Sequence, residues 1–183
     1  MRELDMRGLL PAITFIFSRA GCEDAVSQLR SQGVTLTDAS AAAEITEYVE
    51  RRTSHLNDDD RRALRYSAWL AGLRAGIAAH HAGMVPLFKE IVEELFADGY
   101  LKAVFATETL ALGINMPART VVIEKLTKFT GEHHESLTPG DYTQLTGRAG
   151  RRGIDDEGTA LVLWTPFTTF DEIVQLALSL IHI

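Results

Sequence analysis

Short apolar runs rich in β-forming residues alternate with longer amphipathic stretches along the chain, and no other feature restricts the fold as strongly. The run at residues 11–17 (PAITFIF) predicts a buried strand, and Ser18 follows it in the position of a helix N-cap. Residues 19–32 then carry an apolar stripe at helical spacing, with Gly33 just past its end. A strand that turns directly into a helix is the opening of an α/β unit.

The same alternation continues through the rest of the chain. It predicts further strands at residues 76–79, 101–106, 120–124 and 159–164. It predicts helices at residues 41–52, 58–73, 84–98, 141–148 and 171–183, a short helical turn at 107–112 and a loop or hairpin at 125–137. Because parallel strands are joined by helical crossovers, we expect an α/β fold with a mostly parallel sheet and helices on both faces. The helices near residues 37–73 should form an insertion on one side.

Composition and charge narrow the functional classes. With 183 residues, 46% of them apolar, the chain should hold one domain, which we place at residues 1–166, followed at 167–183 by the start of a truncated C-terminal linker or helix. A general nucleic-acid binder carries a basic surplus, so the net charge of −7 leaves room only for a few local phosphate contacts. Cys22 is the single cysteine, which excludes an internal disulfide and fits a reducing compartment. The apolar run at 9–17 is too short for a bilayer, so we expect a cytoplasmic protein with no membrane partner.

An arginine-rich segment at residues 144–153 (QLTGRAGRRG) gives the strongest chemical signal. Three arginines stand beside three glycines at the end of a predicted helix, where glycine lets the backbone turn tightly and approach a partner. Arg148 and Arg151 are three positions apart, so on a continuing helix they would share a face that Gln144 could join. Two guanidinium forks on one face suit a phosphate with several oxygens, and we expect them at the ligand-facing rim of the sheet.

A plain surface explanation fits the same arginines. They could form an exposed basic turn that pairs with the acidic residues just beyond it, Asp155, Asp156 and Glu157. The chemical explanation is an arginine finger, which neutralises charge on a transferred γ-phosphate and is worth roughly 10³–10⁵ in rate. The residues by themselves leave both explanations open.

A second segment, residues 106–117 (ATETLALGINMP), follows a predicted strand and should lie at the carboxyl edge of the sheet, where open α/β folds bind ligands. Thr107 can cap the short helical turn, and Glu108 suits its positive end. Unpaired amides at a helix start also favour a phosphate, so Thr107 is a candidate nucleic-acid contact as well as a cap.

Two weaker signals follow other strands. Ser18 and Arg19 come directly after the first strand and, as single residues, are explained by a helix cap and a surface side chain. The run at residues 80–86 (HHAGMVP) opens another helix, where His81 and Gly83 could meet a phosphate. Its adjacent histidines do not predict a metal site, because the chain offers no second ligand pair at usable spacing and has one cysteine.

The arginine-rich segment resembles motif VI of superfamily two helicases in its Q-x-x-G-R-x-G-R form. Its GRAGRRG version is characteristic of the superkiller-type (Ski-like) DExH RNA helicases, here most similar to their bacterial, actinobacterial-like branch. Residues 106–117 resemble motif V of that family, residues 17–19 resemble motif IV, and residues 80–86 resemble its HHxGxxP block. The resemblance covers residues 10–166 and implies a RecA-like fold, the second of two motor domains that close on ATP.

The resemblance also implies roles for particular residues. Arg151 would be the arginine finger, Arg148 a second γ-phosphate contact and Gln144 a neighbour of the hydrolytic water. The residues implied in nucleic-acid backbone binding are Ser18, Arg19, His81, Gly83 and Thr107. Those implied in facing the nucleotide or the arginines are Gly113 and Asn115.

Two motifs that the sequence lacks limit the expected activity. It contains neither G-x-x-x-x-G-K-[S/T] nor D-E-x-H, so we predict that the chain alone does not hydrolyse ATP, whose Mg²⁺ would be held by the first domain. The implied partners are single-stranded RNA, with DNA as the alternative, the first RecA-like domain of the same polypeptide and RNA-decay proteins. A DNA-repair-type helicase domain, a non-enzymatic RecA-like adaptor and an unrelated phosphate-binding enzyme stay open as other functions.

Overall fold

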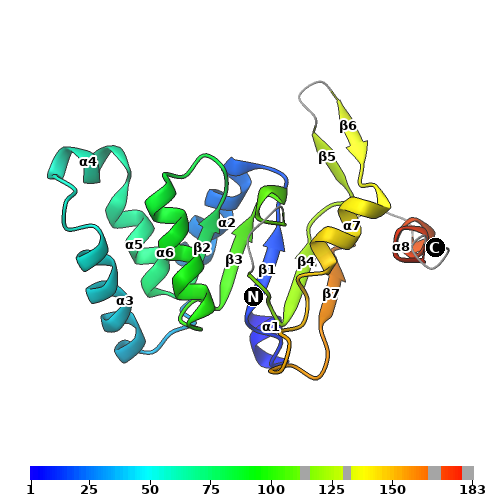
Figure 1. The fold of residues 1–183 in the computed structure, drawn as a ribbon, viewed down its shortest axis with the longest axis horizontal. Coiled ribbons are helices and arrows are strands. Elements are labelled where there is room, and N and C mark those ends of the chain that lie inside the picture. Colours follow the sequence, from blue (N-terminus) through cyan, green and yellow to red (C-terminus); the bar gives the residue numbers. More distant parts are fainter. Residues whose placement is uncertain (112–115, 130–132, 165–169, 179–183) are drawn as a thin grey trace.

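A five-stranded parallel sheet forms the centre of the computed structural model (Figure 1). Its strands run in the order β2-β3-β1-β4-β7, with β1 at Ala12–Phe15, β2 at Ile77–His80, β3 at Ala103–Ala106, β4 at Thr120–Ile123 and β7 at Thr159–Val162. All four pairings of this sheet are parallel, which confirms the predicted α/β class. The structure describes residues 1–111, 116–129, 133–164 and 170–178.

Helices connect the strands and cover both faces of the sheet. They are α1 (Arg2–Met6), α2 (Arg19–Ser31), α3 (Ala39–Arg52), α4 (Asp58–Ala63), α5 (Tyr66–Arg74), α6 (Pro86–Ala97), α7 (Pro139–Thr146) and α8 (Phe170–Leu178), with the 3-10 turn η1 at Glu108–Ala111. Successive strand residues point to opposite faces. Ile13 and Phe15 therefore pack with α3, α5 and α6, whereas Ala12 faces α1, and Cys22 of α2 packs against Ile77. Burial on both faces explains why the strands are apolar throughout.

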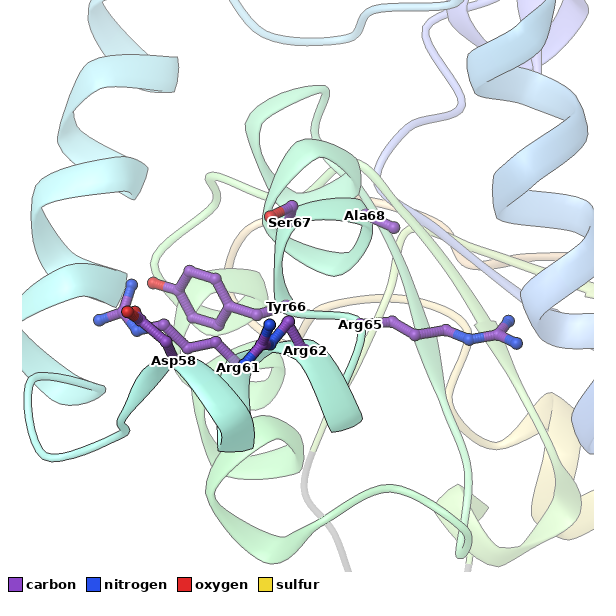
Figure 2. Close-up of a pocket in the computed structure, with 7 residues that line it drawn as sticks. All are labelled: Asp58, Arg61, Arg62, Arg65, Tyr66, Ser67 and Ala68. Atoms are coloured by element: carbon purple, nitrogen blue, oxygen red, sulfur yellow. The ribbon is translucent and has the colours of Figure 1, made fainter.

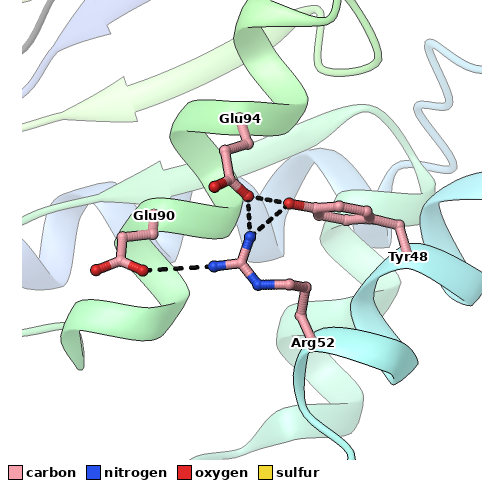
Figure 3. A network of polar contacts seen from close by, with 4 residues as sticks. All are labelled: Tyr48, Arg52, Glu90 and Glu94. Atoms are coloured by element: carbon pink, nitrogen blue, oxygen red, sulfur yellow. Dashed lines mark hydrogen bonds and ion pairs between the residues drawn. The ribbon is translucent and has the colours of Figure 1, made fainter.

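The predicted insertion near residues 37–73 forms α3, α4 and α5, which lie beside β2 at the left of Figure 1. A polar network joins α3 to α6 (Figure 3). In it Arg52 lies 3.4 Å from Glu90 and also contacts Glu94, which accepts a hydrogen bond from the hydroxyl of Tyr48. The insertion is thus fastened to the helix that follows β2.

The single helix predicted at residues 58–73 is wrong, because the structure breaks it into α4 and α5. Arg65 stands at the break in the left-handed conformation, with φ 51° and ψ 37°. For a residue with a Cβ this conformation costs roughly 1–2 kcal/mol. The change of direction lets Tyr66 enter the core while Trp69 stacks on Phe88 with ring centroids 3.7 Å apart. Tertiary packing has therefore overridden a continuous helical pattern.

An antiparallel hairpin projects beyond the carboxyl end of β4 (Figure 1), where the sequence predicted a loop or hairpin. Its strands are β5 (Thr127–Phe129) and β6 (His134–Ser136). On the same side of the domain α8 contacts α7 (Figure 1). The predicted domain boundary at residue 166 and the last part of the predicted helix at 171–183 lie outside the described residues. Among the helices of the described ranges, none is long and apolar enough to cross a membrane.

Candidate functional site

Three neighbouring strands bring most of the predicted nucleic-acid residues to one edge of the sheet. The carboxyl ends of β2, β3 and β1 lead into His81, Thr107 and Ser18, and the sheet order makes these strand ends neighbours. The backbone N–H of Thr107 donates to the carbonyl of His80 at 3.2 Å, which ties two of the ends together. This is the carboxyl edge at which the sequence placed them, while their roles stay predictions.

Ser18 and Arg19 begin α2 at this edge. The Ser18 hydroxyl oxygen accepts a hydrogen bond from the N–H of Gly21 at 3.1 Å, so Ser18 is the cap that the sequence suggested. Capping uses an acceptor lone pair and leaves the O–H proton able to donate to a ligand. Arg19 is exposed and runs alongside Gly83, where an added Cβ would lie 3.3 Å from the Arg19 Cδ. The edge therefore offers a guanidinium group and a hydroxyl donor side by side.

His81 does not present a donor to an outside phosphate. The residue is 7% exposed, Nε2 lies 2.9 Å from a carboxylate oxygen of Glu23, and Nδ1 accepts from the N–H of Gly83 at 3.2 Å. Acceptance at Nδ1 puts the proton on Nε2, which donates to Glu23. Internal bonds thus use both groups to hold the turn before α6, and the phosphate contacts expected of His81 and Gly83 stay predictions.

His80 is a core residue. Its Nε2 lies 2.7 Å from a carboxylate oxygen of Glu93, and burial, against the effect of that carboxylate, lowers the pKa of His80. Within the ranges that the structure describes, no three His, Cys, Asp or Glu side chains gather as a metal site would require.

Thr107 precedes η1 and is half-buried. Its hydroxyl pairs with that of Thr109 at 2.9 Å, while its carbonyl accepts from the N–H of Leu110 at 3.1 Å. One hydroxyl of the threonine pair donates to the other, so one O–H proton is left over for a ligand. Gly113 and Asn115, the predicted nucleotide-facing residues of the same segment, lie outside the described residues.

The helix predicted at residues 141–148 is present as α7, but it does not continue through both arginines. α7 ends at Thr146, and Gly150 takes φ 87°, a left-handed conformation that ends helical geometry before Arg151. Arg148 and Arg151 therefore lie on a turn beyond the helix, whereas Gln144 stays on α7 with its side chain exposed. Their spacing of three does not place the arginines on a shared helical face.

The arginine turn is also not at the rim where the sequence placed it. Ala118 donates its N–H to the Arg148 carbonyl at 2.9 Å, and Gly150 donates to the Ala118 carbonyl at 2.7 Å, which forms a short parallel pairing just ahead of β4. An added Cβ on Gly158 would lie 2.5 Å from the carbonyl carbon of Ala149, so the turn presses against the residues before β7. These contacts place the arginines beside the amino ends of β4 and β7, opposite the edge described above.

Asp155 holds the guanidinium group of Arg151 in a two-pronged ion pair. Nε lies 2.8 Å from Oδ2 and Nη2 lies 2.7 Å from Oδ1, with the two side chains 25% and 3% exposed. The bonds from Arg151 lower the pKa of Asp155 to about 2, and Asp155 in turn raises the pKa of Arg151. The surface pairing that the sequence left open is thus confirmed for Asp155. Asp155 does not engage the two N–H groups of Nη1, so the guanidinium can still meet another anion.

Two residues that shape these sites were not singled out by sequence reasoning. Gly158 gives the arginine turn room to close, and Lys128 of β5 contacts both α7 and η1. Neither stands at a motif spacing, and their partners are 8 to 20 positions away in the sequence, so no local pattern could have found them.

A basic hollow of about 700 Å³ lies over α4 and α5 (Figure 2). Its three arginines do not converge on one point. The guanidinium of Arg61 lies 4.5 Å from the ring centroid of Tyr66, Arg62 contacts Asp59, and Arg65 extends away from the other two. The hollow therefore lacks the shared geometry that a phosphate site needs.

A parallel sheet covered on both faces, with candidate ligand residues at both of its ends, defines an α/β domain of the RecA-like class. The family profile of the helicase conserved C-terminal domain matches residues 46–153. The chain belongs to this family. The matched range includes every candidate residue named above except Ser18 and Arg19.

Curated relatives support the superkiller-type branch. The chain is 59% identical over 175 residues to "Probable helicase HelY" of Mycobacterium tuberculosis (strain CDC 1551 / Oshkosh), which covers 96% of this chain and 19% of that protein. It is 42% identical over 163 residues to "Superkiller complex protein 2" of Homo sapiens, covering 89% of this chain and 13% of that protein. The "DExH-box ATP-dependent RNA helicase DExH11" of Arabidopsis thaliana is also 42% identical over 163 residues, 89% of this chain and 12% of that protein. The chain therefore spans a fifth or less of the length of these relatives.

Proposed function

We propose that the chain is the second motor domain of an ATP-dependent, superkiller-type RNA helicase and acts within a longer polypeptide that moves 3′ to 5′ along single-stranded RNA. One observation carries the proposal. Residues 107–118 join the carboxyl end of β3, where Thr107 lies, to the amino end of β4, where Ala118 pairs with the arginine turn. A single short connection therefore links the candidate nucleic-acid edge to the candidate nucleotide side.

On the nucleic-acid side, the proposed contacts are few and local. Backbone phosphates would bind at the carboxyl ends of β1 and β3. Their partners there would be the Ser18 hydroxyl, the Arg19 guanidinium and the Thr107 hydroxyl, which pairs with that of Thr109. Backbone contacts carry no sequence information, which suits a motor that must step along any sequence. A small number of contacts also agrees with a domain of net charge −7.

On the nucleotide side, the proposed ligand is ATP, with Mg²⁺ held by the first domain of the longer polypeptide. Arg151 would meet the γ-phosphate through its Nη1 edge while Asp155 fixes the other edge. A guanidinium that is already oriented loses little freedom when charge develops on the phosphate. Arg148 and Gln144 are the proposed neighbours of the same phosphate and its attacking water, and RNA-decay proteins are the proposed partners of the whole polypeptide.

Replacing Arg151 with alanine in the longer polypeptide tests the nucleotide-side role. We expect RNA-stimulated ATP hydrolysis to fall by roughly 10³-fold or more, because the finger acts on charge that develops during transfer. Binding of an ATP analogue, measured by fluorescence titration, should change far less. The matched control is Arg152→Ala, an exposed arginine on the same turn that lies outside the motif. Wild-type turnover by Arg151→Ala would exclude the finger role.

A further inference from the structure

We infer that Lys128 is a positioning residue that couples nucleic-acid binding at the carboxyl edge to the placement of the arginine turn. The inference rests on the proposed function and adds to it a residue that no helicase motif of the sequence contains. Its basis is a group of three charged side chains, Lys128, Glu108 and Asp141, which come from three different elements.

Lys128 lies where the hairpin, η1 and α7 meet. Its Nζ is 3.2 Å from Oδ1 of Asp141 and 3.6 Å from Oε2 of Glu108. The side chains of Lys128 and Asp141 are 23% and 26% exposed, so solvent screens their attraction only in part. One ammonium group thus holds together the base of the hairpin, the turn after Thr107 and the helix that leads into the arginine turn.

Asp141 transmits this contact to the first turn of α7. While its Oδ1 faces Lys128, its Oδ2 accepts from the N–H of Thr138 at 2.9 Å and from the Thr138 hydroxyl at 2.8 Å. Thr138 in turn caps the helix by accepting from the Asp141 N–H at 3.1 Å. Burial would raise the pKa of Asp141, but its bonds from Thr138 and Lys128 outweigh burial and lower it, so the carboxylate stays charged at neutral pH.

Glu108 connects the same lysine to the nucleic-acid edge. It is the first residue of η1 and directly follows Thr107, the proposed phosphate contact. α7 also packs against η1, and Arg148 lies two residues past the end of α7. A shift of η1 on nucleic-acid binding would therefore change the distance between Lys128 and Glu108. Lys128 also contacts Asp141 in the first turn of α7, and the arginine turn follows the last turn of α7.

The exposure of these groups separates a coupling role from a purely structural one. Partly exposed ion pairs add little to folding stability, so removing Lys128 should leave the domain folded. The same contacts bear on the relative placement of three elements, because Lys128 joins β5 to both η1 and α7. The coupling free energy is the difference between the free energies of binding one ligand in the presence and in the absence of the other. It has the same value whichever of the two ligands is measured.

The experiment measures this coupling in the longer polypeptide. The affinity for single-stranded RNA is determined with and without a non-hydrolysable ATP analogue, for the wild type and for Lys128→Met, Lys128→Arg and Glu108→Gln. For the wild type we expect the analogue to change RNA affinity. For Lys128→Met we expect that change to shrink by about fivefold or more, with RNA affinity in the absence of nucleotide and the melting temperature both near those of the wild type. Lys128→Arg should restore most of the coupling, and Glu108→Gln should weaken it in the same sense.

Lys125→Met is the matched control, because Lys125 is an exposed lysine three residues earlier and outside this group of charges. Wild-type coupling in Lys128→Met would overturn the inference. So would an equal loss of RNA affinity with and without the analogue, since that would be a binding or folding defect. If Arg151→Ala abolishes hydrolysis while Lys128→Met stays fully coupled, the proposed function stands and only this inference fails. If the wild type shows neither RNA binding nor hydrolysis, the proposed function itself fails.

Discussion

At the scale of single residues, the pairing of Arg151 with Asp155 decides how the arginine is presented. The carboxylate binds the Nε side of the guanidinium, and the backbone N–H of Arg151 also donates to Oδ2 at 3.0 Å. A side chain that is so held cannot rotate freely. The sequence named Asp155 as one of three acidic partners, but a spacing of four gives no sign of which acid the turn would choose.

The pair should make stability depend on pH in acid. Asp155 has an ordinary pKa of 3.8 and a folded pKa of about 2, so its contribution is complete above about pH 4 and is lost as the pH falls through 2. Because the arginine is partly exposed, we expect this contribution to be on the order of 1–2 kcal/mol at neutral pH. Urea unfolding at pH 7, 4 and 2.5 should show this loss of stability in acid for the wild type and not for Asp155→Asn. Equal pH profiles for the two proteins would contradict it.

At the scale of elements, the contact between the arginine turn and the start of β7 depends on a missing side chain. An added Cβ on Gly158 would lie 2.5 Å from the carbonyl oxygen of Ala149 and 2.6 Å from the N–H nitrogen of Gly150, closer than real contacts allow. Both neighbours are backbone atoms, which cannot move without displacing the turn. The glycine therefore fixes how closely the turn and the strand approach.

Replacing Gly158 with alanine should destabilise the domain by about 1–3 kcal/mol, the usual cost of an overpacked site, and should weaken ATP hydrolysis by the longer polypeptide. Thermal unfolding and an ATPase assay measure the two effects. Gly140→Ala is the control, because its Cβ would meet nothing closer than a threonine hydroxyl at 3.7 Å and it lies within α7. A Gly158→Ala protein as stable as Gly140→Ala would show that the turn is not packed as described.

The sequence was informative about elements wherever one local pattern decided the outcome. Every predicted strand of the sheet is present, because buried parallel strands have an unmistakable apolar run. It failed at the break in residues 58–73, where Arg65 takes a left-handed conformation, and it did not anticipate the left-handed Gly150 between the two arginines. In both places contacts from distant elements decide the backbone path, and helical periodicity does not contain them.

At the scale of the whole molecule, the two candidate sites lie at opposite ends of one sheet, and neither is complete. The carboxyl edge supplies hydrogen-bond donors suited to a phosphate, and the amino side supplies arginines. The sequence has no phosphate-binding loop or D-E-x-H string. The edge-level placement of Ser18 and Thr107 was predictable, because strand order and direction follow from the fold class. The location of Arg148 and Arg151 was not, since it depends on a pairing with Ala118, which lies 30 positions before Arg148 in the sequence.

The purified chain is therefore expected to show no RNA-stimulated ATP hydrolysis, whereas the longer polypeptide should hydrolyse ATP and unwind duplexes with a 3′ single-stranded RNA tail. Duplexes with a 5′ tail should stay intact. A coupled ATPase assay and a strand-displacement gel measure these outcomes. Hydrolysis by the chain alone that survives Arg151→Ala would contradict the assignment of a half-motor.

The bond between Arg151 and Asp155 also bears on which end of a nucleotide this turn could favour. Since the carboxylate is ionised at every physiological pH, the guanidinium always has a counter-charge within the domain. Any phosphate that binds must then attract Arg151 in competition with the Asp155 carboxylate. A terminal phosphate, with two charges, does so better than a bridging phosphate with a single charge. This competition alone favours the terminal phosphate of a nucleotide over its bridging phosphates, without a separate recognition element.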